Sequence, residues 1–153
     1  MVDVSGKRST ARTATARGRV RCDAGTIRLI AADRIAKGSV VDTARLAGIM
    51  AAKRTAELIP LCHPLALRYV DVDVHLDDSP PAVVIEATVK VDGVTGVEME
   101  ALTAVAVAAL TVIDMIKAVD RWATITDIAL TRKEGGKSGT VERPASRDQS
   151  DSS

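Results

Sequence analysis

The chain has 153 residues, of which 46% are apolar and 27% are charged, as expected of a globular protein that buries a core within one domain. Its 21 basic and 20 acidic residues nearly cancel, so net charge gives no argument for a nucleic-acid or membrane partner. Aromatic residues are nearly absent, which also disfavours base stacking by a single-strand binder. The two cysteines form no disulfide framework, and the N-terminus lacks the apolar stretch of a signal peptide. We therefore expect a cytoplasmic protein.

The polar residues 1–16, rich in Arg and Thr, are expected to be loosely ordered. After them, the spacing of apolar residues predicts strands at 18–22, 26–32, 68–77, 83–91 and 124–131, and helices at 39–58 and 97–119. The strands at 68–77 and 83–91 each have one polar side, which favours an antiparallel sheet with helices on one face. Without one N-terminal strand, the order is β-α-β-β-α-β, which predicts a ferredoxin-like α+β sandwich. We expect residues 1–140 to form a single catalytic domain, followed by a disordered polar tail at 141–153.

Two charged residues, Asp114 and Lys117, interrupt an apolar stretch from 101 to 119. A helix that is apolar on all sides should be mostly buried, and burial of an ion costs on the order of several kcal/mol. The structural interpretation is that Lys117 interacts with the helix dipole and Asp114 neutralises it. The pattern favours instead an active site with a partly desolvated lysine that transfers protons.

The start of the same helix also carries charge. Thr95 and Glu98 have the spacing of a capping box, whereas Glu100 points to a different side and is left without that explanation. Carboxylates at this position suit a cationic or amide-like group, such as the amino-pyrimidine edge of a guanine. The segment Leu61-Cys62-His63, held between two prolines, is expected to contact a substrate, although a histidine bonded to backbone is the commoner outcome. The four Cys and His residues have no zinc-type spacing, so a metal site is not expected.

Basic residues cluster outside the strands, with Arg34 and Lys37 before the first helix and Lys133 and Lys137 near a Gly-rich loop at 135–139. Each of these residues alone is an ordinary solvated charge. Together with the backbone N–H groups that the glycines leave accessible, they are suited to bind several phosphate groups. The loop is not a P-loop, because its spacing and context differ. The residues thus indicate an enzyme for a phosphate-bearing small molecule, without naming its reaction.

Several motifs together resemble one family, the molybdenum cofactor biosynthesis protein C family of cyclic pyranopterin monophosphate synthases. The resemblance covers residues 1 to about 140. It is carried by Met1-Val-Asp-Val-Ser5, Lys37-Gly38, Ala44-Arg-Leu-Ala-Gly-Ile49, Leu58-Ile-Pro-Leu-Cys-His-Pro-Leu65, Thr95-Gly-Val-Glu-Met-Glu-Ala-Leu-Thr-Ala104, Asp114-Met-Ile-Lys-Ala-Val119 and Gly135-Gly-Lys-Ser-Gly139.

The resemblance implies a lyase that converts 3′,8-cyclo-7,8-dihydro-GTP to cyclic pyranopterin monophosphate and releases pyrophosphate, without a metal or organic cofactor. It implies a homohexamer, a trimer of dimers, with active sites at the dimer interfaces. It also implies a catalytic Asp114 assisted by Lys117 and Lys37. The implied substrate-binding residues are Leu61, Cys62, His63, Glu98, Met99, Glu100 and Lys133.

The chain departs from the family pattern at three positions. Val94 stands where the family usually has Lys, Ser39 where it has an acid, and Ile113 where it has Tyr. The first two changes leave open a non-catalytic ligand-binding domain of the same fold. A nucleic-acid-binding domain is disfavoured, because the expected sheet carries Asp71 and Asp73 rather than basic and aromatic residues.

Overall fold

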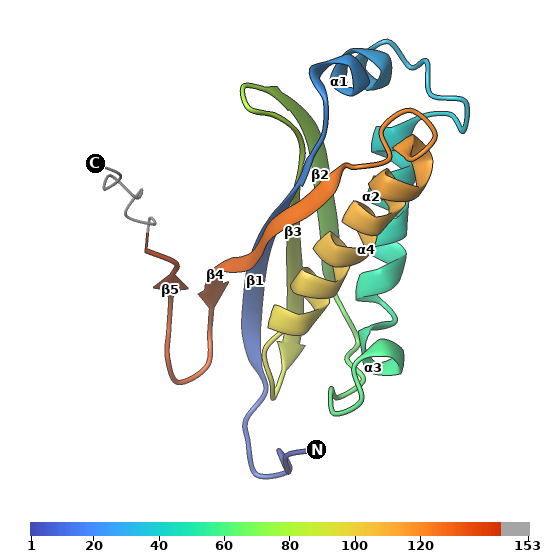
Figure 1. Cartoon of the computed structure of the whole chain (residues 1–153). Coiled ribbons are helices and arrows are strands. Elements are labelled where there is room, and N and C mark those ends of the chain that lie inside the picture. Colours follow the sequence, from blue (N-terminus) through green and yellow to red (C-terminus); the bar gives the residue numbers. More distant parts are fainter. Residues whose placement is uncertain (145–153) are drawn as a thin grey trace.

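The computed structural model describes residues 1–144 and shows an open β-sheet with helices on one face (Figure 1). Along the chain the elements are β1 (Thr10–Arg21), α1 (Ala24–Ala31), α2 (Val40–Ala52), α3 (Thr55–Leu58), β2 (Tyr69–Asp78), β3 (Pro81–Gly93), α4 (Glu98–Ile116), β4 (Thr124–Glu134) and β5 (Val141–Glu142). The strand order is β2-β3-β1-β4-β5, and all neighbours are antiparallel. The elements β1, α2, β2, β3, α4 and β4 have the β-α-β-β-α-β order, which confirms the ferredoxin-like α+β sandwich.

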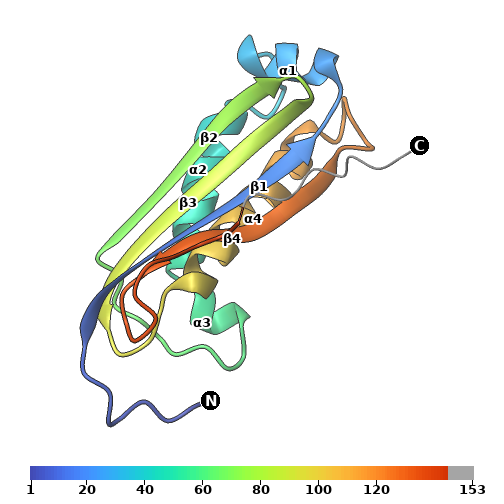
Figure 2. The same ribbon diagram turned by 90° about the vertical axis from the view of Figure 1, so that its left-hand side faces the viewer.

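The central position of β1 contradicts the expectation of loose order for residues 10–16, whereas no helix or strand includes residues 1–9. Figure 2 shows β1 between β3 and β4, and its pairing with β3 begins at Thr10 opposite Gly93. Ala14 and Ala16 are buried against the helices, while the alternating Thr15, Arg17 and Arg19 face the other way. The strand predicted at 18–22 matches only the second half of β1. The first half was missed because its inward side chains are small and its outward ones polar, as in a loop.

The helices α2 and α4 lie side by side on the sheet and close the core (Figure 1). Their close approach depends on small residues: a Cβ atom on Gly48 of α2 would lie 3.0 Å from the carbonyl oxygen of Ala104 on α4. In residues 1–144, α4 is the one helix long and apolar enough to cross a membrane, but Ala101, Val105 and Val112 on it are fully buried in the core. Core packing thus accounts for the apolar character of α4.

Two predicted elements are wrong and the others are confirmed. Residues 26–32 do not form a strand, because α1 occupies Ala24–Ala31 and buries Thr26, Ile27 and Ile30 at helical spacing. The helix predicted at 39–58 is divided, since α2 ends at Ala52 and α3 begins at Thr55. The strands at 68–77, 83–91 and 124–131 and the helix at 97–119 match β2, β3, β4 and α4 within a few residues at their ends. Where a disordered tail from 141 was expected, Val141–Glu142 pair with β4, and residues 145–153 lie outside the described part.

Candidate active site

Asp114, in the last turn of α4, binds two lysines that reach it from different parts of the chain. Its Oδ2 atom accepts a hydrogen bond of 2.6 Å from Lys37 Nζ, and its Oδ1 atom accepts one of 2.8 Å from Lys117 Nζ. Lys37 Nζ also donates to the main-chain oxygen of Asp114 at 3.0 Å. These hydrogen bonds, first from Lys117 and then from Lys37, lower the pKa of Asp114 to about 2. The carboxylate is therefore ionised at neutral pH and holds two ammonium groups.

The expectation that Asp114 and Lys117 are buried is wrong for the single chain. Their side chains are 55% and 60% exposed, and that of Lys37 is 49% exposed. Asp114 and Lys117 lie on the solvent side of the end of α4, whereas Met115 and Ile116 between them are buried in the core. The predicted pairing is confirmed, but desolvation within one chain does not explain it.

The loop between α1 and α2 brings Lys37 to the end of α4. Asp33 takes a left-handed backbone conformation (φ 53°) after α1, and Gly38 takes another (φ 97°), where glycine is favoured. Ile35 is buried between them and anchors the loop in the core. Ser39 then begins α2, and its hydroxyl accepts a hydrogen bond of 3.3 Å from the N–H of Asp42. Lys37 is thus presented between a buried side chain and a capped helix.

A second polar cluster surrounds the other end of α4. A hollow of about 440 Å³ is lined there by residues that include the predicted Leu61, Cys62, His63, Glu98, Met99 and Glu100. His63 Nε2 lies 2.9 Å from the carbonyl oxygen of Val2, which ties the N-terminal segment to this loop. Burial, followed by the negative charge of Glu100, raises the pKa of Cys62, so its thiol stays protonated at neutral pH.

The two glutamates at the start of α4 have different environments. The predicted capping box is wrong: the N-cap residue is Val97, and no side chain caps the helix. Glu98 turns instead toward β4, where Lys133 Nζ lies 3.3 Å from its Oε1 atom. Glu100 is only 4% exposed, and this burial raises the pKa of its carboxyl group. A carboxyl group with these properties suits proton exchange or hydrogen bonding to a substrate amide.

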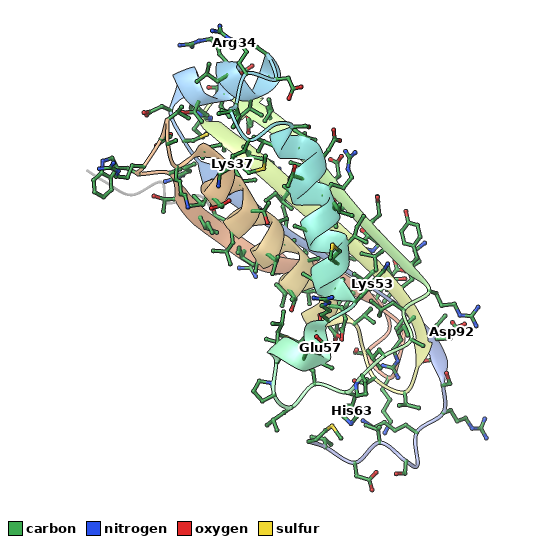
Figure 3. The ribbon with its side chains drawn as sticks, turned by 90° about the vertical axis from the view of Figure 1, so that its right-hand side faces the viewer. Arg34, Lys37, Lys53, Glu57, His63 and Asp92 are labelled. Carbon is green, nitrogen blue, oxygen red and sulfur yellow. The ribbon has the colours of Figure 1, made fainter. Side chains whose placement is uncertain are left out.

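The two clusters lie at opposite ends of the helix layer, with Lys37 near one end and His63 at the other (Figure 3). Glu98 and Asp114 are sixteen residues apart on α4, which at about 1.5 Å per residue is about 24 Å. One chain therefore does not bring all the predicted site residues together. It carries a lysine–aspartate cluster (Lys37, Asp114, Lys117) and a carboxylate cluster (Leu61–His63, Glu98–Glu100, Lys133).

Basic residues of the N-terminal segment were missed as candidates. A hollow of about 720 Å³ beside the carboxylate cluster is lined in part by Lys7, Arg8, Arg12 and Lys137. Arg12 donates hydrogen bonds of 3.0 and 3.2 Å to the carbonyl oxygens of residues 93 and 94. The many Arg and Lys residues near the N-terminus were the available signal, but the segment was read as loose. Lys137 lines this basic hollow, whereas Lys37 belongs to the lysine–aspartate cluster, so the two do not form the single phosphate site that the sequence suggests.

The described residues 1–144 contain no group of three or more His, Cys, Asp or Glu side chains that could hold a metal ion. The chain matches the model of the MoaC family over residues 1–136. It is 64% identical to the cyclic pyranopterin monophosphate synthase of Parvibaculum lavamentivorans, over 91% of this chain and 87% of that protein. It is 59% identical to the enzyme of that name from a Nocardioides species (94% and 89% covered) and 60% identical to that of Thermomicrobium roseum (94% and 86% covered). The chain therefore belongs to the MoaC family.

Proposed function

We propose that the chain is a cyclic pyranopterin monophosphate synthase of molybdenum cofactor biosynthesis. It acts as a lyase on 3′,8-cyclo-7,8-dihydro-GTP, forms cyclic pyranopterin monophosphate and releases pyrophosphate. The observation that carries the proposal is the name shared by relatives that are 59–64% identical over most of the chain. The enzyme works in the cytoplasm and without a metal or organic cofactor.

The complete active site is formed by two copies of the chain. The lysine–aspartate cluster and the carboxylate cluster are about 24 Å apart along α4, too far to act on one nucleotide-sized substrate. In a two-fold symmetric dimer whose helix layers run in opposite directions, the end of one α4 lies against the start of the other. Exposed apolar side chains on these helices support such packing: Leu46 and Met50 on α2 and Leu110 on α4. Three such dimers form the hexamer.

The lysine–aspartate cluster handles protons and developing charge. Asp114 accepts hydrogen bonds from Lys37 and Lys117 on its two oxygens, which fixes both ammonium groups at one place. Lys117, oriented in this way, moves protons as the ring system of the substrate opens and closes again. Lys37 stabilises negative charge as the cyclic phosphate forms and pyrophosphate leaves. Contact with the second chain removes water from these exposed side chains and strengthens their interactions with the substrate.

The carboxylate cluster binds the base and positions the substrate. Glu100 is buried and its carboxyl group has a raised pKa. It can therefore accept a hydrogen bond from the amino-pyrimidine edge of the substrate or, when protonated, donate one to it. The contact between Lys133 and Glu98 places a cation beside a carboxylate that lines this hollow. Leu61, Cys62, His63 and Met99 complete the lining. Val94, which stands where the family usually has a lysine, also lies beside the neighbouring basic hollow, where Lys7 and Arg12 supply cations.

The test is to incubate the purified chain with 3′,8-cyclo-7,8-dihydro-GTP and to measure pyrophosphate release. We expect turnover by the natural chain and none by Lys117→Ala or Asp114→Asn, with fold and oligomer unchanged. Lys90→Ala is the matched control, because Lys90 lies 5.1 Å from the ring of Tyr69 and lines neither the hollow of the carboxylate cluster nor the basic hollow. Normal turnover by Lys117→Ala would contradict the proton-transfer role. If the natural chain releases no pyrophosphate, it is a ligand-binding domain and not this enzyme.

A further inference from the structure

A buried carboxylate outside both clusters connects two segments of the chain. Asp120 follows α4 and is only 7% exposed. Its Oδ2 atom accepts a hydrogen bond of 2.8 Å from the main-chain N–H of Asp23 and one of 3.3 Å from the hydroxyl of Thr26. Both donors lie at the start of α1, so a single oxygen atom of Asp120 joins the chain after α4 to the first turn of α1.

The start of α1 lacks a cap of its own. Asp23 occupies the N-cap position, but its side chain makes no capping hydrogen bond. A helix begins with N–H groups that have no partner within the helix, and a carboxylate near them is stabilised by the helix dipole. Asp120 takes this place from a position 97 residues further along the chain. The contact is therefore long-range, and it fixes where α1 begins relative to the end of α4.

The two joined segments are those that deliver the lysines to Asp114. Lys117 lies in the turn that ends α4, and the same turn continues to Asp120, whose N–H donates to the Ile116 carbonyl at 2.9 Å. On the other side, α1 leads directly into the loop that carries Lys37. That loop is bonded back to α1, because the N–H of Arg34 donates to the Leu29 carbonyl at 2.9 Å. A shift of α1 would therefore move Lys37 relative to Asp114.

The ion pair of Lys37 with Asp114 cannot hold the loop by itself. Both side chains are about half exposed, and exposed ion pairs contribute little, because water competes and long side chains lose freedom. The hydrogen bonds of Asp120 are buried, and loss of a buried acceptor leaves its donors unpaired. The loop geometry thus depends on buried contacts, and Asp120 provides a polar one between α1 and the chain after α4.

We infer that Asp120 is a positioning residue that keeps Lys37 on Asp114 by holding α1 against the chain that follows Lys117. Its effect on turnover rests on the proposed function. Its effect on the contact between Lys37 and Asp114 does not, and can be measured without any substrate.

The first experiment follows the titration of the Asp114 carboxyl group by NMR in the whole protein. In Asp120→Ala, we expect the pKa of Asp114 to rise part of the way from about 2 toward its ordinary value near 3.8, because Lys37 withdraws while the larger effect of Lys117 remains. Simple removal of a negative charge would shift this pKa downward, so the sign of the change separates the two effects. In Asp120→Asn the amide oxygen accepts both hydrogen bonds, and the pKa stays low. Thr26→Val removes one donor only and gives a smaller rise, which keeps the test open if Asp120→Ala does not fold.

The second experiment measures pyrophosphate release by the same variants. We expect kcat of Asp120→Ala to fall, by up to about a hundredfold for a displacement near 1 Å, while Asp120→Asn keeps most of the activity. In a Lys37→Ala background, Asp120→Ala should cause little further loss, since it acts through Lys37. Asp77→Ala is the control for loss of a carboxylate, because Asp77 accepts hydrogen bonds from Arg19 (2.6 Å) and the N–H of Ser79 (3.2 Å) and bonds neither lysine.

An unchanged Asp114 titration in Asp120→Ala would overturn the inference, as would an equal rise in Asp120→Asn. Fully additive losses with Lys37→Ala would overturn it as well. An inactive natural chain would contradict the proposed function and leave the titration result standing.

Discussion

The separation of the two clusters makes a prediction about mixtures of inactive chains. Lys117→Ala disables the lysine–aspartate cluster, and Glu100→Gln disables the carboxylate cluster about 21 Å away, fourteen residues along α4. If each active site takes one cluster from each of two chains, then a pair of unlike variants contains one site with both clusters intact. The other site of that pair contains both substitutions.

The expected recovery follows from the two-fold symmetry. When equal amounts of the two variants pair at random, half of all dimers contain one chain of each variant. One of the two sites in each such dimer is intact, so about one quarter of the natural activity returns. The estimate is unchanged when dimers assemble further, because each site still involves one pair. Each variant alone should release almost no pyrophosphate.

The assay uses the two variants with different affinity tags, unfolded and refolded together, and compared with each variant refolded alone. Capture on one tag and detection of the other verifies that unlike chains have paired. The matched control mixes Lys117→Ala with Asp114→Asn, which lie in the same cluster and should not restore activity. Verified mixed assemblies of Lys117→Ala and Glu100→Gln without activity would refute the shared site, as would recovery in the control mixture.

Three further predictions concern stability. Burial raises the pKa of the Glu100 carboxyl group, so the folded chain binds the carboxyl proton more tightly than the unfolded chain does. The folded chain therefore loses stability as the pH rises and Glu100 ionises. Glu100→Gln should raise Tm at pH 7 and not at pH 3. A Cβ atom on Gly18 would lie 2.7 Å from Val105 Cγ1, so Gly18→Ala should cost about 1–3 kcal/mol in urea unfolding. Combination with Val105→Ala should cost less than the sum of the two. Asp33 has a left-handed backbone (φ 53°), so Asp33→Val should cost about 1–2 kcal/mol, whereas Asp33→Gly should not destabilise the chain.

The sheet could be predicted where one side of a strand is clearly apolar. The Val residues of β2 alternate with Asp, which marks both the strand and its buried face. The first half of β1 and the first helix gave no such signal. Ala14 and Ala16 are too small to distinguish β1 from a loop, and the short apolar run from Thr26 fits a strand or a helix. The carboxylate that caps α1 is Asp120, and no local pattern could have connected the two.

In the candidate active site too, only contacts between residues close in the sequence could be predicted from spacing. The pairing of Asp114 with Lys117 follows from helical spacing alone, and it is present. The contact of Lys37 with Asp114 depends on a loop that returns to the far end of another helix, so only the family resemblance suggested it. The expected burial of the two charges was wrong, because they lie on the solvent side of a helix end whose other side, with Met115 and Ile116, is buried.

The distribution of charge along α4 nevertheless carries information about assembly. Glu98 and Glu100 begin the helix and Asp114 ends it, while the turns between them are apolar. Part of this apolar section remains uncovered: Leu110 is 58% exposed, and Leu46 on the adjacent α2 is 59% exposed. A monomeric enzyme gains nothing from exposing such residues between two distant polar clusters. A second copy that covers them in the opposite direction would bury the apolar section and join unlike clusters at both ends, so one packing arrangement accounts for both features.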